Sequence, residues 1–235
     1  LATQCIAIKK PKRMRIRLDG TLRDYVRAKD VALRIIGVIG SSGGRGHAIE
    51  YAGAVARALP IEGRLTMCNL TIEAGSRTGL VAPDDATFTW LHGRPWAPKG
   101  AMWERALAAW RTLRTDDEAT FESDIVIDCS DLEPQITWGT DPGQVVAVGG
   151  RVPDGAGLDA GRRALHEKAL AYMGLQPGMS LEGLPVQRLA NSDALTEVAV
   201  AMGSEDIDGL YAAIGEGRVS ARAVAQRIQQ ELRSG

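Results

Sequence analysis

The 235-residue chain has few cysteines, few aromatic residues and almost no net charge. Aromatic residues make up only 5% of it, so its core must be built mainly from Ala, Val, Ile and Leu. The 28 basic and 29 acidic residues leave a formal net charge of −1, which gives no overall attraction to nucleic acid or to an anionic membrane. We therefore predict neither a DNA partner nor a membrane partner.

The three cysteines, Cys5, Cys68 and Cys129, are far apart, and no two of them form a Cys-x-x-Cys pair. An odd and sparse set argues against a disulfide framework and indicates a reducing compartment, so we expect a cytoplasmic protein. The apolar runs, such as 145–148, are far shorter than the roughly 18 residues that span a bilayer. No signal peptide opens the chain, and its first residue is Leu rather than Met, which suggests an internal fragment.

Helical and strand patterns alternate along the chain, which predicts an α/β fold. We expect strands at 13–18, 47–53, 125–127, 135–137 and 144–148, and helices at 28–39, 61–77, 84–92, 101–113 and 159–173. Residues 152–157 have the composition of a linker. The segment after Asn191 predicts only helices, at 191–202, 204–214 and 220–232. We therefore divide the chain into an α/β domain, 1–187, and a helical segment, 188–235.

The basic segment 9–18 has two interpretations. Its charge is typical of a nuclear-import or nucleic-acid patch. Its pattern, in which Met14, Ile16 and Leu18 alternate with arginines, predicts a strand with one solvated face, and we favour the strand.

The glycine-rich segment 40–46 matches G-x-S-x-G around Ser42. A hydrolase nucleophile in that motif needs a strand before it and a helix after it, and the predicted order here is the reverse. We therefore expect a loop that lets backbone approach closely or cradles an anion, not a nucleophilic serine.

Several long motifs occur in a fixed order: GHAIEYAG at 46–53, GRLTMCNLTIEAG at 63–75, GLVAPD at 79–84, PQITWGT at 134–140 and KALAYMGL at 168–175. Together they closely resemble the large subunits of 3-isopropylmalate dehydratases, which belong to the aconitase superfamily. The resemblance covers about residues 1–187. It implies a partial aconitase-superfamily domain.

That resemblance implies a hydro-lyase that interconverts 2-isopropylmalate and 3-isopropylmalate in leucine biosynthesis, by losing and regaining water. In the family a [4Fe-4S] cluster acts as Lewis acid, and a small subunit completes the site. The catalytic residues carried over are Asn69, which approaches the cluster-bound oxygen, and Glu73, which pairs with a histidine. Their spacing of four predicts one helical face; without the resemblance, they would be read as exposed helix neighbours.

The family's cluster cysteines come from a Gly-Ser-Cys-Thr-Asn motif and a later Cys-x-x-Cys, and neither occurs in this chain. The Asp-Ser-His motif that supplies the partner of Glu73 is also missing. His47, His92 and His166 match no catalytic position, so we expect them to be structural. We predict a fragment without metal ligands that is inactive alone.

The segment 183–235 resembles a different family. The motifs GLPVQRL at 183–189 and DGLYAAIGEGRVSA at 208–221 are similar to the helical region of RelA/SpoT-type (p)ppGpp synthetase/hydrolases. This implies a chimeric chain, joined near 183–188, with no synthetase or hydrolase domain. It also leaves open an alternative function, a regulatory module that contacts RNA or the ribosome through Arg218, Arg222 and Arg227. A third alternative is an independent scaffold or small-molecule binder that reuses the α/β fold.

Overall fold

The computed structural model describes residues 8–181 together with Ala213 and Arg218. The chain divides into two units, 1–179 and 180–235. Of the second unit, Ala213 is helical and buried. The other residues of the helices expected after Asn191 lie outside the described part of the chain. Arg218 lies between two of these expected helices. The domain boundary expected at 187 stays a prediction.

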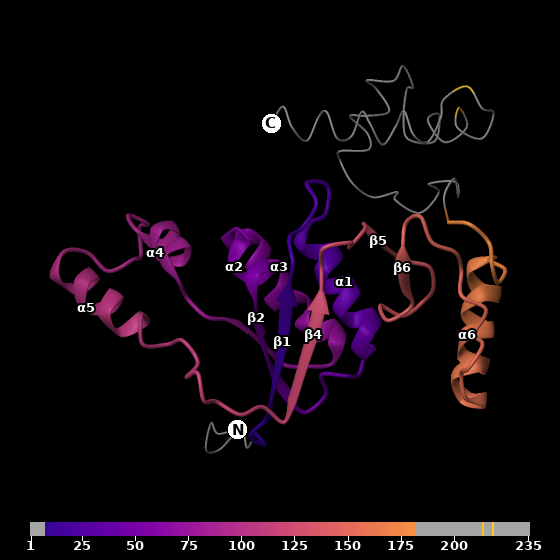
Figure 1. The fold of residues 1–235 in the computed structure, drawn as a ribbon, viewed down its shortest axis with the longest axis horizontal. Coiled ribbons are helices and arrows are strands. Elements are labelled where there is room, and N and C mark those ends of the chain that lie inside the picture. The colour runs from indigo at the N-terminus through magenta and orange to yellow at the C-terminus, as the bar shows by residue number, and fades with distance from the viewer. Residues whose placement is uncertain (1–7, 182–212, 214–217, 219–235) are drawn as a thin grey trace, which may run out of the picture. The chain divides into compact units, whose positions relative to one another are not determined.

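The first unit is built on a four-stranded parallel sheet (Figure 1). In the order β3-β2-β1-β4, its strands are β3 (Thr78–Val81), β2 (His47–Ala52), β1 (Lys12–Asp19) and β4 (Ser123–Asp128). The helices are α1 (Ala28–Ile39), α2 (Ala54–Ala58), α3 (Ile61–Leu70), α4 (Asp85–Leu91), α5 (Ala101–Trp110) and α6 (Ala160–Met173), with a 3₁₀ turn η1 (Thr71–Ala74) after α3. The antiparallel pair β5 (Gln135–Thr137) and β6 (Val145–Ala147) packs against α1. The predicted α/β class is confirmed.

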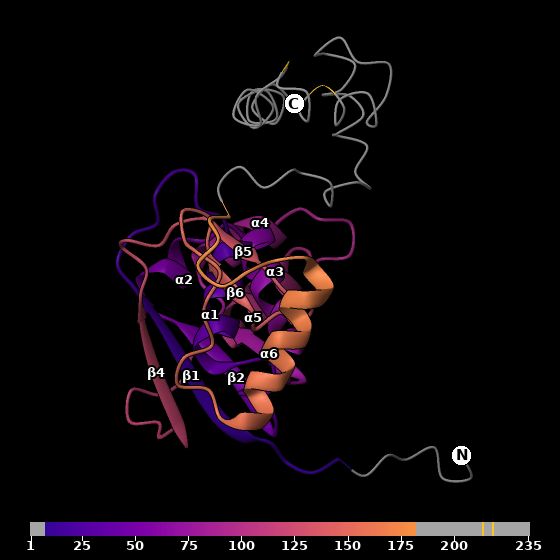
Figure 2. The same cartoon turned by 90° about the vertical axis from the view of Figure 1, so that its right-hand side faces the viewer.

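The core lies between one face of the sheet and helices α1 and α3. In β1, Met14, Ile16 and Leu18 are buried, while the arginines between them point to the opposite face. Figure 2 shows β4 and β1 to the left of α1 and α3. Burying each of these large apolar side chains contributes about 1.5–3 kcal/mol. The strand interpretation of the basic segment is therefore confirmed.

The outer face of the sheet carries charged side chains together with the exposed Leu80 and Val126, whereas the faces of parallel sheets are normally covered. Arg15 forms a two-pronged ion pair with Asp124 of the neighbouring strand and lies 4.5 Å from the centre of the Phe121 ring. The Thr115 hydroxyl donates to Glu50 at 2.6 Å. These contacts explain why the sequence of β1 alternates apolar and basic residues.

Three predicted elements need correction, and two further elements, α2 and β3, were not predicted. The helix expected over 61–77 ends at Leu70, continues as η1, and is followed by β3, where a break was expected. Helix α2 was not predicted. Helix α5 ends three residues before the predicted Leu113, because Arg111 begins a turn. The strand expected to be buried at 144–148 is shorter and half-buried, since β6 pairs only with β5.

The linker expected at 152–157 is instead packed structure. Val152 is buried, its N–H donates to the Met179 carbonyl at 2.9 Å, and its carbonyl accepts from the Gly178 N–H at 2.8 Å. The Pro153 carbonyl lies 3.1 Å from Nε2 of His166 on α6. The segment therefore packs against α6 and residues 178–179 within the first unit. None of the described helices is long and apolar enough to cross a membrane.

Candidate functional site

Asn69 and Glu73 lie on consecutive but different elements. Asn69 is in the last turn of α3, and Glu73 is in η1. The helix expected over 61–77 is therefore not one continuous α-helix, because the change from α-helix to 3₁₀ helix falls between the two residues. The shared face expected for them stays a prediction. We call residues 69–75 the Asn69–Glu73 turn.

The Asn69–Glu73 turn lies at the amino end of the parallel sheet. Ala74 accepts a hydrogen bond from the Gly44 N–H at 2.8 Å, and the Ser76 hydroxyl donates to the carbonyl of His47, the first residue of β2, at 2.6 Å. Ligands of open α/β sheets usually bind at the carboxyl ends of the strands. The two predicted catalytic residues are at the opposite end, so the position of the sheet alone would not have revealed them.

A buried hydroxyl pair fixes the start of this turn. The Thr71 hydroxyl donates to the Met67 carbonyl at 3.0 Å and lies 2.8 Å from the Tyr51 hydroxyl of β2. Burial raises the pKa of Tyr51 to about 12. Gly79 on β3 faces the same hydroxyl, and a Cβ there would collide with it. The turn is therefore held against two strands of the sheet.

The glycine-rich loop 40–46 packs on the other end of the turn. Gly75 has φ +83°, and a Cβ there would come within 3.1 Å of the Ser41 carbonyl oxygen. The loop follows α1 and precedes β2. This helix–loop–strand order is the reverse of a nucleophile elbow, as predicted for Ser42. The glycines allow backbone-to-backbone packing beneath the turn.

The surface of the turn is exposed and partly apolar. Asn69 and Glu73 are both exposed, and neither side chain has a hydrogen-bond or ion-pair partner within the described part of the chain. Leu65 and Ile72, about one helical turn before and after Asn69, are 56% and 60% exposed. These two exposed apolar side chains lie on either side of the polar side chain of Asn69 in the sequence.

The cysteines of the described region do not fit a [4Fe-4S] cluster. Cys68 packs beside Gly79 of β3, whereas Cys129 follows β4 at the other edge of the sheet. Three strand spacings of about 4.8 Å separate those edges. Burial raises the pKa of the Cys68 thiol and, with nearby Asp128, that of Cys129 to about 11, which disfavours the thiolates that a cluster needs. Cys5 lies outside the described residues.

The histidines are spread over the unit and take part in packing. His166 is buried, with its ring 4.9 Å from that of Trp138, and His92 lies edge-on to Trp103 at 4.9 Å. His47 is within 3.1 Å of the Arg45 carbonyl. Across residues 8–181, no group of three or more His, Cys, Asp or Glu side chains is arranged to hold a metal ion.

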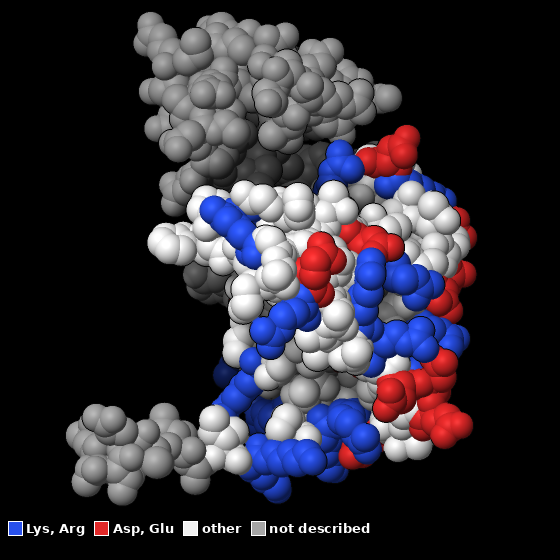
Figure 3. All heavy atoms as spheres, turned by 90° about the vertical axis from the view of Figure 1, so that its left-hand side faces the viewer, with Lys and Arg blue, Asp and Glu red and all other residues white. Residues whose placement is uncertain are grey.

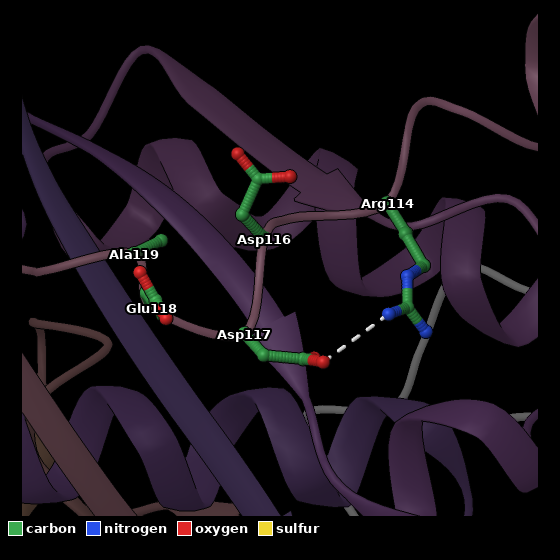
Figure 4. Close-up of a pocket in the computed structure, with 5 residues that line it drawn as sticks. All are labelled: Arg114, Asp116, Asp117, Glu118 and Ala119. Atoms are coloured by element: carbon green, nitrogen blue, oxygen red, sulfur yellow. Dashed lines mark hydrogen bonds and ion pairs between the residues drawn. The ribbon is translucent and has the colours of Figure 1, made fainter.

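A surface hollow of about 470 Å³ lies in the segment between α5 and β4. Its charged residues are Arg114, Asp116, Asp117 and Glu118. Figure 4 shows the three carboxylates pointing in different directions, with Asp117 turned toward Arg114, 3.3 Å away. Diverging carboxylates create neither a metal site nor an acid–base pair. Figure 3 shows acidic and basic side chains next to one another over much of one face, so that face has no strong field of one sign.

Comparison with known proteins assigns the chain to a family. The profile of the aconitase family (aconitate hydratase) matches residues 1–191. The chain belongs to the aconitase family.

Within that family it is similar to 3-isopropylmalate dehydratase large subunits. It is 50% identical over 210 residues to large subunit 1 of Bradyrhizobium diazoefficiens, covering 85% of this chain and 44% of that relative. It is 54% identical over 187 residues to the large subunit of Anaeromyxobacter dehalogenans, covering 79% and 39%. The chain thus spans less than half the length of these curated relatives. The profile of the RelA/SpoT AH domain matches residues 158–229, overlapping the aconitase match.

Proposed function

We propose that this chain is part of the large subunit of a 3-isopropylmalate dehydratase, a hydro-lyase that interconverts 2-isopropylmalate and 3-isopropylmalate. The identity of 50–54% over about four-fifths of the chain carries this proposal. The corresponding partner is the small subunit of that enzyme, and the corresponding compartment is the cytoplasm.

The contribution of this chain is the Asn69–Glu73 turn. The Asn69 carboxamide can donate to and accept from a substrate oxygen, and the Glu73 carboxylate can accept a proton or orient a histidine. Both groups are exposed and have no partner in the described part of the chain, so they are available to substrate and to other protein segments. The hydroxyl pair of Tyr51 and Thr71 beneath them fixes the backbone from which they project.

The chain alone is inactive in this proposal, because its cysteines do not provide a cluster site. Anaerobic iron–sulfur reconstitution of the chain, followed by an assay of isopropylmaleate hydration with and without a small subunit, should give neither a stoichiometric cluster nor turnover. The intact large subunit of Anaeromyxobacter dehalogenans serves as positive control. A stoichiometric cluster with turnover on this chain would refute the inactivity.

The proposed role itself is tested by complementation. We would mix this chain with the rest of the Anaeromyxobacter dehalogenans large subunit and with a small subunit, and then measure isopropylmaleate hydration. Activity should appear only with all three parts and should fall at least 100-fold with Glu73→Gln, in keeping with the loss of a general base. Glu118→Gln, on the unrelated surface hollow, is the matched control and should leave activity unchanged.

The match of 158–229 to the RelA/SpoT AH domain supports a second candidate, a module that contacts RNA or the ribosome. Titration with RNA at two salt concentrations tests it. If the module contacts Z phosphates of single-stranded RNA, a plot of the logarithm of the binding constant against the logarithm of the salt concentration should have a slope of about −0.7Z. Binding that does not depend on salt would exclude this candidate.

A further inference from the structure

Helix α5 is amphipathic, yet none of its residues is buried. It is held to α4 by aromatic contacts: Trp110 stacks on Phe88 with ring centres 6.3 Å apart, and Trp103 meets His92 at 4.9 Å. Figure 1 shows both helices at the left of the unit, reached from β3 by an extended segment. The apolar side of α5 that carries Trp103 and Trp110 therefore packs on α4 rather than in the main core.

Several large apolar side chains of α5 and of the loops on either side of it are exposed. Trp96 is 97% exposed, Met102 59% and Leu113 61%. A hollow of about 410 Å³ lies between the loop 94–98 and Trp110. Pro95 and Pro98 restrict that loop, so the hollow is largely pre-formed. We call Trp96, Met102, Trp110 and Leu113, with this hollow, the α5 surface.

Arg94 places a cationic donor at the edge of the α5 surface. Its Nε donates to the Trp90 carbonyl at 2.8 Å, and its guanidinium carbon lies 3.4 Å from the centre of the Trp90 ring. The Trp90 indole N–H in turn donates to Glu62 at 2.9 Å. The terminal nitrogens of Arg94 make no hydrogen bond to any described residue, and the charge of Arg94 interacts with the Glu62 carboxylate through space. The surface thus fits an apolar protein segment that carries a carboxylate or carbonyl beside its apolar side chain.

We propose that the α5 surface is covered by the part of the large subunit that lies outside this chain's match to its relatives. The match spans 39–44% of those relatives, so more than half of their length is available to cover it. The surface falls within the aconitase match, 1–191, and not in the segment that matches the other family alone. Exposed apolar patches of this kind mark protein contacts. This inference rests on the proposed function.

The test measures binding rather than turnover. The full chain is titrated with the remaining part of the Anaeromyxobacter dehalogenans large subunit, and the dissociation constant is measured by calorimetry. Trp96→Ala should weaken binding at least tenfold, and Arg94→Gln severalfold. Tyr172→Ala removes an aromatic side chain that is 75% exposed on α6 and should change binding less than twofold. Circular dichroism of each variant shows that the fold is retained, which we expect because Trp96 is almost fully exposed.

A second readout locates the contact. Hydroxyl-radical footprinting should show that oxidation of Trp96 and Met102 falls on mixing, whereas that of Tyr172 does not. Failure to form a complex, or equal binding by the Trp96→Ala and parent chains, would overturn the inference. Self-association of the chain alone in sedimentation velocity, abolished by Trp96→Ala, would also overturn it, since a second copy would then be the occupant. Binding without recovered hydration leaves this inference standing and counts against the proposed function.

Discussion

Arg64 on α3 and Asp84, the N-cap of α4, form a two-pronged ion pair. Nη1 and Nη2 of Arg64 lie 2.7 and 2.8 Å from the two carboxylate oxygens. Arg64 is 4% exposed, and it also donates to the Leu59 and Arg57 carbonyls at 3.0 and 2.7 Å. A single side chain thus joins the end of α2, the body of α3 and the start of α4, which leads into the α5 surface.

Replacing Arg64 should destabilise the unit substantially. Arg64→Met leaves Asp84 with only its hydrogen bonds from Thr87, and it leaves the Leu59 and Arg57 carbonyls without their Arg64 donor. We therefore expect the free energy of unfolding to fall by about 3 kcal/mol. Urea denaturation followed by circular dichroism measures this change. Arg114→Met removes an exposed ion pair with Asp117 and should change stability by less than about 0.5 kcal/mol. Equal effects of the two substitutions would contradict the role of Arg64.

The same pair predicts a dependence of stability on acid pH. Hydrogen bonds from Arg64 lower the pKa of Asp84 below its usual value. A carboxyl whose pKa is lowered by folding stabilises the fold above its unfolded pKa of about 3.9, and this stability is lost as pH falls through the lower folded value. We expect unfolding to become easier below about pH 4, and Asp84→Asn to flatten that dependence. Asp131→Asn, at a 95% exposed carboxylate, should leave the pH profile unchanged.

Local patterns predicted α1, β5 and the start of α6, because capping residues and periodicity mark those elements directly. Strand β3 was missed because Thr78-Gly79 reads as a break. Gly79 occupies this position because the end of α3 and Thr71 pack closely against it. This is a tertiary contact that the local sequence pattern does not show. The packed segment 152–157 was misread for the same reason, since its partners are Gly178, Met179 and His166. Local composition does not encode such partners.

The candidate site also depends on tertiary contacts that local sequence patterns do not predict. Asn69 and Glu73 were predicted from their motif, and their spacing did not predict that η1 begins between them. The buried pair of Tyr51 and Thr71, which supports the turn, was not predicted. Two hydroxyls twenty residues apart give no local pattern. The exposed apolar surface of α5 could not be predicted either, since its amphipathic sequence only indicates that something covers it.

Tyr51 predicts a loss of stability at alkaline pH. Burial raises its pKa to about 12, so its ionisation opposes folding. The stability is complete below the unfolded pKa of about 10 and is lost as pH rises toward 12, by about 2–3 kcal/mol in all. We expect Tyr51→Phe to reduce this alkaline loss, measured by denaturation at several pH values. Tyr172→Phe, at an exposed position, should behave like the parent chain. An unchanged profile in Tyr51→Phe would show that another group is responsible.

Gly79 predicts a steric link between β3 and the Asn69–Glu73 turn. A Cβ at this position would collide with the Thr71 hydroxyl and lie 3.0 Å from Cα of Cys68, so Gly79→Ala should force α3 away from the sheet. We expect a loss of about 1–3 kcal/mol in the free energy of unfolding, in keeping with overpacking of a core. Adding Thr71→Ala should recover part of that loss, because it removes the colliding hydroxyl, whereas two independent sites would give additive losses. Gly161→Ala, at an exposed position of α6, is the same chemical change and should stabilise the chain by up to about 1 kcal/mol.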